Sequence, residues 1–308
     1  MPSMRAWVAV TDSDWFRFLS SLPEVDEVNF WQPSGGRRFA VLQPGEILLF
    51  KLHAPERAIV GGGFFAGHSV VPAAMAWDSF GQKNGAATFD DMVRRIERYS
   101  RGLVGPEHPI GCILLEQPFF WEQKDWMPEP ADWKPNIVQG KSYDLTAAPV
   151  GTWLWEQVQF RLLTAPIELE EPVEETVFGE PRLVRLRLGQ GSFKILVADA
   201  YQRRCAVTGE KILPVLEAAH IRPVSSGGLH RIDNGLLLRS DVHTLFDRGY
   251  VTVTSDHRLR VSARLRDEFD NGAYYLNMDG AAIRLPERTD DRPDPAALEW
   301  HSDEVFRP

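Results

Sequence analysis

The sequence predicts an α+β protein of two domains, and three observations support this expectation. The chain has 308 residues, which is enough for two ordinary domains and a connector. Short apolar strands and amphipathic helices mix over the first 145 residues, whereas a strand–loop–strand–helix pattern marks the last third. A stretch rich in glutamate and proline separates them and has little to bury. We therefore expect domains at 1–145 and 181–308, joined by a linker at 146–180.

The composition is that of a soluble globular protein, with 44% apolar and 25% charged residues. No apolar run approaches the ~20 residues that span a bilayer, and the N-terminus lacks the pattern of a signal peptide. We therefore expect a cytoplasmic protein. The two cysteines, Cys112 and Cys205, are far apart in sequence, which excludes a Cys-x-x-Cys zinc knuckle and a disulfide framework.

The charge is unevenly distributed along the chain. The net charge of −9 argues mildly against nucleic acid as a partner. From Pro181 to Arg266, however, 15 Lys and Arg residues stand against 7 Asp and Glu residues, so this segment is basic. A basic segment on an acidic protein can neutralise phosphates locally, although a solvated charged face explains the same counts equally well.

The N-terminal domain begins with a strand at Arg5–Val10 and a helix that Asp12 or Ser13 caps. The apolar runs Phe39–Leu42 and Ile47–Leu52 flank a Pro-Gly-Glu segment, which indicates a hairpin. These elements predict a mixed α/β unit.

Further strands and helices follow. Ala58–Val71 is typical of a strand, interrupted by three glycines that indicate a turn, a bulge or a close backbone approach. Thr88 begins a helix with a capping-box pattern, and Ile110–Glu116 forms another strand. Trp153–Leu163 is an amphipathic piece inside the connector.

The C-terminal domain opens with an alternating strand at Leu183–Leu188 and a helix at Phe193–Arg203. A second strand ends near His220, and a helix capped by Ser240 or Asp241 follows a third strand. The tail from residue 286 to residue 308 is rich in Asp and Pro, and we expect it to wrap the domain surface.

Four short segments carry the chemistry of this domain. In chain order they are Cys205–Gly209, Leu216–Pro223, Asp233–Leu238 and His243–Gly249. The Ala-His-Ile-x-Pro, Asn-Gly-Leu-Leu-Leu and His-x-Leu-Phe-Asp-x-Gly motifs together resemble the HNH (ββα-metal) endonucleases, in particular the subgroup found in restriction endonucleases. The resemblance covers about residues 182–308 and implies a ββα-metal fold.

The resemblance implies a role for each motif residue. His220 is the general base, because an imidazole titrates near neutral pH. Asn234 hydrogen-bonds the loop and holds the base in its rotamer and tautomer. His243 binds one divalent cation, Mg²⁺ or Mn²⁺, which stabilises the leaving 3′-oxygen. Asp247 lies four residues further, on the same helical face, and can share that metal.

One position departs from the family pattern. Many members have Asp or His as a metal ligand directly before the base, where this chain has Ala219. Either Asp247, water and phosphate oxygens complete the metal site, or Glu217 reaches into it. Asp247 is equally well explained as a surface carboxylate at the end of a helix. A lone His220 would more often be a core histidine, but its spacing to Asn234 and His243 favours a nuclease.

Basic residues around the motif are candidate contacts for DNA phosphates. They are Arg185, Arg187, Arg203, Arg204 and Arg222. Any one of them is more simply a solvated surface arginine, whereas the group beside a phosphodiesterase motif favours DNA. His257 and His301 lie beyond the motif, and we interpret them as surface or packing histidines.

The N-terminal domain resembles the PUA-like superfamily, which includes the EVE, ASCH and SRA domains. The resemblance rests on the order of its elements and on the Pro-Gly-Glu-Ile-Leu-Leu-Phe segment. It implies a mixed β-barrel that recognises a modified cytosine by base flipping. A flipped base needs aromatic walls and a few polar groups, for which Trp31, Trp77 and Asp78 are candidates. Tryptophans in a domain of this size are more often core residues.

The sequence thus predicts a metal-dependent DNA endonuclease that restricts DNA carrying 5-methylcytosine or 5-hydroxymethylcytosine. Cutting both strands needs two active sites, so we expect a homodimer on double-stranded DNA. Three alternatives stay open at this point. The protein can be a nuclease or nickase on unmodified DNA or on RNA, a DNA-binding module with a decayed active site, or a protein whose N-terminal domain binds RNA.

Overall fold

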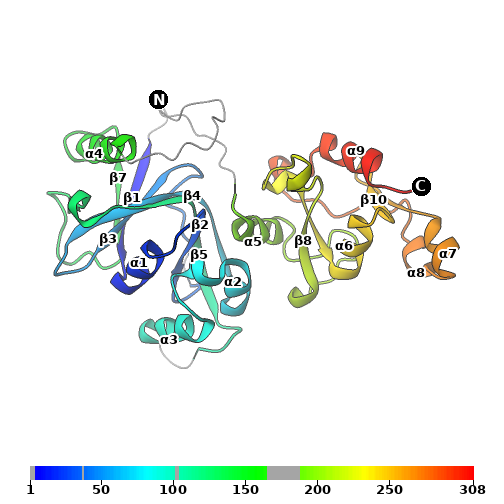
Figure 1. The fold of residues 1–308 in the computed structure, drawn as a ribbon, viewed down its shortest axis with the longest axis horizontal. Coiled ribbons are helices and arrows are strands. Elements are labelled where there is room, and N and C mark those ends of the chain that lie inside the picture. Colours follow the sequence, from blue (N-terminus) through cyan, green and yellow to red (C-terminus); the bar gives the residue numbers. More distant parts are fainter. Residues whose placement is uncertain (1–3, 37, 101–103, 165–187) are drawn as a thin grey trace. The chain divides into compact units, whose positions relative to one another are not determined.

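The computed structural model describes residues 4–36, 38–100, 104–164 and 188–308 and forms two compact units (Figure 1). The division between the units falls within 165–187, outside the described residues. The acidic stretch of the predicted linker and all but the last residue of the expected strand Leu183–Leu188 also lie outside them, as do Arg185 and Arg187.

The N-terminal unit is built on a mixed sheet with the strand order β2-β5-β4-β3-β1-β7, and β6 pairs with β4. The strands are β1 (Arg5–Thr11), β2 (Glu27–Gln32), β3 (Ile47–Leu52), β4 (Ala58–Pro72), β5 (Pro109–Phe120), β6 (Met127–Pro128) and β7 (Gly140–Asp144). β1 and β3 run parallel, and the other pairs are antiparallel. Every residue of β3 is buried, because it has a neighbour on each edge and helices over the sheet.

Helices cover both faces of this sheet. They are α1 (Ser13–Ser20), α2 (Ala73–Phe80), α3 (Phe89–Tyr99) and α4 (Val150–Thr164). Successive residues of β3 point to opposite faces: Leu48 and Phe50 join the core cluster that contains α1, whereas Ile47 and Leu49 join the cluster that contains α4. Asp12 caps α1 through the backbone N–H groups of the first turn, as predicted.

Two expectations for this unit are corrected by the structure. The predicted hairpin is wrong, because Phe39–Leu42 forms no strand and β3 pairs instead with β1 and β4. Phe39 and Leu42 are still buried in the core, which explains their apolar character. β4 is not interrupted at its glycines but runs through them with two shifts of register. At Gly61 a Cβ atom would lie 2.2 Å from the carbonyl oxygen of Phe119, so the close backbone approach requires glycine.

Helix α4 extends this unit beyond residue 145. Its residues Leu154 and Val158 are fully buried against Leu145 and the sheet. The first part of the predicted linker is therefore a packed helix.

The C-terminal unit contains a two-stranded hairpin followed directly by a helix. Strands β8 (Leu216–His220) and β9 (Gly235–Arg239) pair antiparallel, and α6 (Ser240–Asp247) follows. The other elements are α5 (Gln190–Ala200), β10 (Val251–Val253), β11 (Leu259–Val261), α7 (Arg264–Phe269), α8 (Ala273–Leu276) and α9 (Pro295–Glu304). The 3₁₀ turns among the described residues of both units are η1 (Gly81–Asn84), η2 (Gln123–Asp125), η3 (Leu213–Val215), η4 (Val224–Ser226), η5 (Ile232–Asn234) and η6 (Thr289–Asp291). The predicted α+β class and the ββα arrangement are confirmed.

Two details of this unit differ from expectation. Neither Ser240 nor Asp241 caps α6, which begins after Arg239 without a side-chain cap. Asp241 instead accepts hydrogen bonds from Arg239 and Tyr275. The tail does not only wrap the surface, because its helix α9 inserts Leu298 into the core. Among the described helices, none combines the length and the apolar character needed to cross a bilayer.

Candidate active site

His220 ends strand β8 with its ring held between two neighbours. The ring stacks on Phe193 of α5, with centroids 4.0 Å apart and planes 10° apart. Its Nε2 atom lies 3.0 Å from Nδ1 of His230. Burial, reinforced by the nearby His230 and His243, lowers the pKa of His220 to about 4. The ring is therefore neutral at physiological pH and can accept a proton.

Asn234 closes the loop between the two strands from inside. Its Oδ1 atom accepts a hydrogen bond from the backbone N–H of Arg222 at 2.9 Å. Its Nδ2 atom donates to the carbonyl oxygens of Arg222 and Leu229, each at 2.9 Å. The side chain is buried, so these contacts are shielded from water. This is the geometry expected of an asparagine that holds the loop, while the ring of His220 is held by His230 and Phe193.

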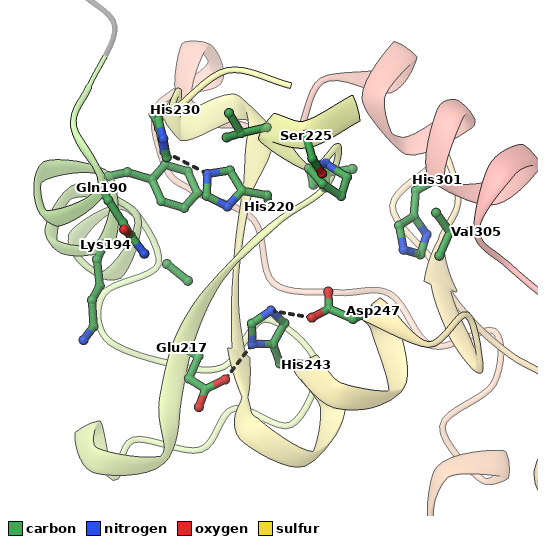
Figure 2. Close-up of a pocket in the computed structure, with 15 residues that line it drawn as sticks. Gln190, Lys194, Glu217, His220, Ser225, His230, His243, Asp247, His301 and Val305 are labelled. Atoms are coloured by element: carbon green, nitrogen blue, oxygen red, sulfur yellow. Dashed lines mark hydrogen bonds and ion pairs between the residues drawn. The ribbon is translucent and has the colours of Figure 1, made fainter. Parts of the chain in front are cut away.

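His243 lies on α6 between two carboxylates (Figure 2). Its Nδ1 atom is 2.6 Å from Oε2 of Glu217 on β8, and its Nε2 atom is 3.4 Å from Oδ2 of Asp247, one helical turn further on. A carboxylate only accepts hydrogen bonds, so Glu217 holds the ring proton on Nδ1. The lone pair of Nε2 then faces Asp247.

This donor set fits a divalent cation. Histidines that bind metals commonly donate their other N–H to a carboxylate, which is the role of Glu217 toward His243. Two atoms 3.4 Å apart, on His243 and Asp247, can both ligate an ion whose bonds are about 2.1 Å long. No group of three or more His, Cys, Asp or Glu in the described part of the chain is arranged to hold a metal. The site therefore offers two protein ligands, His243 and Asp247. Two protein ligands suit Mg²⁺, because this ion commonly keeps several waters in its coordination shell.

His220 and His243 line the same cleft, which has a volume of about 830 Å³. Figure 2 shows the side chains of β8, α5 and α6 that line it. Lys194 of α5 also lines the cleft and supplies a positive charge that can meet a phosphate. The general-base candidate and the cation ligands therefore face one shared space, large enough for a phosphodiester and its water.

His301 borders this cleft as a buried packing residue. It is 2% exposed and stacks on Phe246 of α6, with centroids 3.7 Å apart. Its Nδ1 atom is 2.8 Å from Oγ1 of Thr252, and burial lowers the pKa of His301 to about 4. The predicted packing role agrees with this position, and the stack anchors the helix that carries His243.

Three residues of the site were not singled out in the sequence. They are His230, Phe193 and Lys194. His230 lies in the loop between His220 and Asn234, so its place inside the motif was the available signal. Phe193 and Lys194 follow the Gln-Gly segment at the start of α5, and nothing in their spacing points to the hairpin.

Three of the predicted phosphate contacts, Arg203, Arg204 and Arg222, lie in the described part of the chain, and none of them lines the cleft. Arg203 pairs with Asp199 at 3.3 Å. Arg222 donates to the carbonyl oxygen of Ser226 at 2.7 Å and lies over the ring of Trp300. These two side chains and Arg204 are absent from the cleft lining.

The three predicted base-pocket residues of the N-terminal unit each have a different environment. Trp31 of β2 donates its indole N–H to the carbonyl oxygen of Asn84 at 3.0 Å. Trp77 of α2 packs against Phe89, and Asp78 is exposed. Among the described residues no hydrogen bond or ring contact joins Trp31 to Trp77 or Asp78, so the pocket stays a prediction.

Comparison with known proteins supports the assignment of the C-terminal unit. Residues 205–254 match the model of the family described as HNH endonuclease. No curated protein matches the chain.

Solved structures resemble the chain at low identity. ASCH from Zymomonas mobilis is 12% identical, with 52% of this chain and 94% of that chain covered and a TM-score of 0.31. A variant of that protein is 11% identical, with coverage of 51% and 99% and a TM-score of 0.32. The modification-dependent restriction endonuclease TagI is 14% identical, with coverage of 97% and 81% and a TM-score of 0.30. The stretch 205–254, which holds His220, Asn234 and His243, is thus similar to HNH endonucleases, and this match supports a nuclease.

Proposed function

We propose that the C-terminal unit hydrolyses phosphodiester bonds of DNA with one divalent cation, Mg²⁺ or Mn²⁺. The observation that carries this proposal is the shared cleft: a neutral imidazole at His220 faces the same space as the Nε2 atom of His243. Phosphodiester hydrolysis needs a base for water and a positive charge at the phosphate. Both requirements are met by residues within one ββα segment.

Each residue of the site has its own role in the proposed reaction. His220 takes the proton of the attacking water, while Phe193 and His230 hold its ring in place. His243 and Asp247 would hold the cation, which supplies charge neutralisation at the phosphate and the leaving 3′-oxygen. Lys194 lies where it can orient the phosphate. The absence of an acidic residue at Ala219 is compensated by Glu217, which orients His243 from the same strand.

For the N-terminal unit, we propose selection of DNA that carries 5-methylcytosine or 5-hydroxymethylcytosine by flipping the modified base. The support is the resemblance of its sequence to PUA-like domains. The aromatic content of the unit, including Trp31 and Trp77, adds to this support. A homodimer would bring two active sites to one duplex, as cutting both strands requires.

A digestion panel tests the proposal. Plasmids that are plain, methylated, hydroxymethylated or glucosylated are each incubated with Mg²⁺, Mn²⁺ or EDTA. We expect cleavage of the methylated or hydroxymethylated plasmid with a metal and none with EDTA. His220→Ala should abolish cleavage, whereas His53→Ala, at an exposed position of the other unit, should not change it.

Other outcomes identify the alternatives. Equal cleavage of all plasmids would leave a nuclease without modification dependence, and accumulation of nicked circles would indicate a nickase. If wild-type protein binds DNA but never cuts it with either metal, the protein is a binding module and the proposal is wrong. Competition by tRNA would indicate an RNA-binding N-terminal unit. Sedimentation with and without duplex DNA reports the oligomeric state.

A further inference from the structure

We infer that His230 is a positioning residue for the base, one that keeps the proton-accepting lone pair of His220 on Nδ1. The inference rests on the proposed function, because it concerns how His220 receives a proton from water. It is carried by the contact between the two imidazoles and by the way the aromatic ring of Phe193 confines both of them.

The two histidine rings meet edge to face in a fixed arrangement. His220 Nε2 is 3.0 Å from His230 Nδ1, and the ring planes are 71° apart. Phe193 stacks on His220 and also makes an edge contact with His230 at 5.7 Å between centroids. With an aromatic ring against both imidazoles, rotation of either ring would break two contacts.

A hydrogen bond between two neutral imidazoles needs an N–H on one and a lone pair on the other. If His220 donates through Nε2, its Nδ1 atom carries the lone pair and can accept a proton. If His230 donates instead, the proton of His220 lies on Nδ1 and that atom cannot act as a base. Figure 2 shows the second ring nitrogen of His220 on the edge away from His230. Catalysis therefore requires His230 to be the acceptor.

The same contact stabilises the ring after proton transfer. The proton of water goes to Nδ1 of His220, and the resulting imidazolium donates its Nε2–H to Nδ1 of His230. Hydrogen bonds from a charged donor are roughly twice as strong as neutral ones. The ring then loses the Nδ1 proton to solvent once the product has left, so the pair returns to its starting state. The other ionisable groups that line the cleft are Lys194 of α5, Glu217 of β8, His243 and Asp247 of α6, and His301 of α9.

Two substitutions separate an acceptor from a space-filling role. His230→Asn offers an amide oxygen close to the place of Nδ1, whereas His230→Phe fills the space without an acceptor. We expect kcat of His230→Phe to fall roughly 10²-fold with little change in KM, which is the loss typical of impaired general-base catalysis. His230→Asn should recover most of this loss. His257→Asn is a matched control, because that residue has a φ of 60°, which asparagine tolerates.

The tautomer itself is a second readout that needs no cleavage. In ¹⁵N NMR of the full chain, we expect His220 to be protonated at Nε2 in wild type and in His230→Asn, and to lose this preference in His230→Phe. The inference is overturned if His230→Phe keeps the wild-type kcat or if His230→Asn is as inactive as His230→Phe. It is also overturned if His220 is protonated at Nδ1 in wild type. Failure of wild type to cut, or full activity of His220→Ala, would instead overturn the proposed function and leave the tautomer measurement valid.

Discussion

Glu217 and His243 are joined across the hairpin and the helix by a contact of 2.6 Å between Oε2 and Nδ1. The glutamate comes from β8 and the histidine from α6, 26 residues later. This contact turns Nε2 of His243 toward Asp247. The position of β8 therefore affects how well His243 and Asp247 on α6 can bind a cation.

Loss of this contact should weaken metal binding without removing a ligand. We expect Glu217→Gln to lower the apparent affinity for Mn²⁺ by about 10–100-fold, the usual cost of losing such a supporting carboxylate. Titration of cleavage with Mn²⁺ measures the shift, and calorimetry measures it without activity. Glu299→Gln on the exposed side of α9 is the control. An unchanged Mn²⁺ midpoint would show that Glu217 does not orient the ligand.

Asn234 should be required for the stability of its loop. Asn234→Ala removes three hydrogen bonds and leaves the carbonyl oxygens of Arg222 and Leu229 without this donor. We expect a loss of about 2–4 kcal/mol in the free energy of unfolding of this unit, with faster hydrogen exchange in residues 221–234. Protection equal to wild type in that segment would contradict the assigned role.

The pH dependence of cleavage should follow the low pKa of His220. The base must be unprotonated, and burial lowers its pKa to about 4 in the free protein. We therefore expect kcat/KM to stay level from neutral pH down to about pH 5 and to fall only near pH 4, rather than near the usual 6.5. A profile measured with saturating metal at each pH tests this. An acid limb centred near 6.5 would show that His220 is not the titrating base.

His301 should make the C-terminal unit sensitive to acid. Its pKa is about 4 when folded and near 6.5 when unfolded. Between these values the unfolded chain binds a proton that the folded chain does not, so stability is present above pH 6.5 and declines as the pH falls toward 4. At about 1.4 kcal/mol per pKa unit, the loss is on the order of 3 kcal/mol.

His301→Phe isolates this contribution. The substitution retains an aromatic ring against Phe246 but has no titrating nitrogen. We expect lower stability than wild type at pH 7, because the contact with Thr252 is lost, but a smaller decrease between pH 7 and pH 4.5. Hydrogen exchange of α9 in wild type and in His301→Phe, measured at pH 7 and at pH 4.5, gives the stability and its decrease for each protein. An equal decrease in stability between pH 7 and pH 4.5 in wild type and in His301→Phe would contradict the prediction.

The core of the site could be predicted because it is local in sequence. His220, Asn234 and His243 lie within 24 residues, and a hairpin followed by a helix brings such residues together in any compact packing. Glycine, proline and apolar residues at the right places indicated that hairpin and helix. The ββα order was therefore predicted correctly, and the three motif residues lie within it.

Errors arose where a contact with a distant segment overrode a local pattern. The pattern of Ile47–Leu52 predicted a hairpin with Phe39–Leu42, but the partners of this strand are β1 and β4. Asp241 is a typical helix cap, yet Arg239 and Tyr275 bind its carboxylate instead. Local propensity is worth only a fraction of the free energy that such tertiary contacts supply.

The amino-acid sequence alone determined which chemical groups the nuclease segment carries and in what order along a strand, a loop and a helix. Only the tertiary structure decided how their rings are oriented: Phe193 comes from α5 to stack on His220, and Glu217 reaches His243 across the hairpin. The physical reason is that spacing along one element determines which residues share a face, whereas the proton position on an imidazole depends on the group at its other nitrogen. That group comes from wherever the packed core places it.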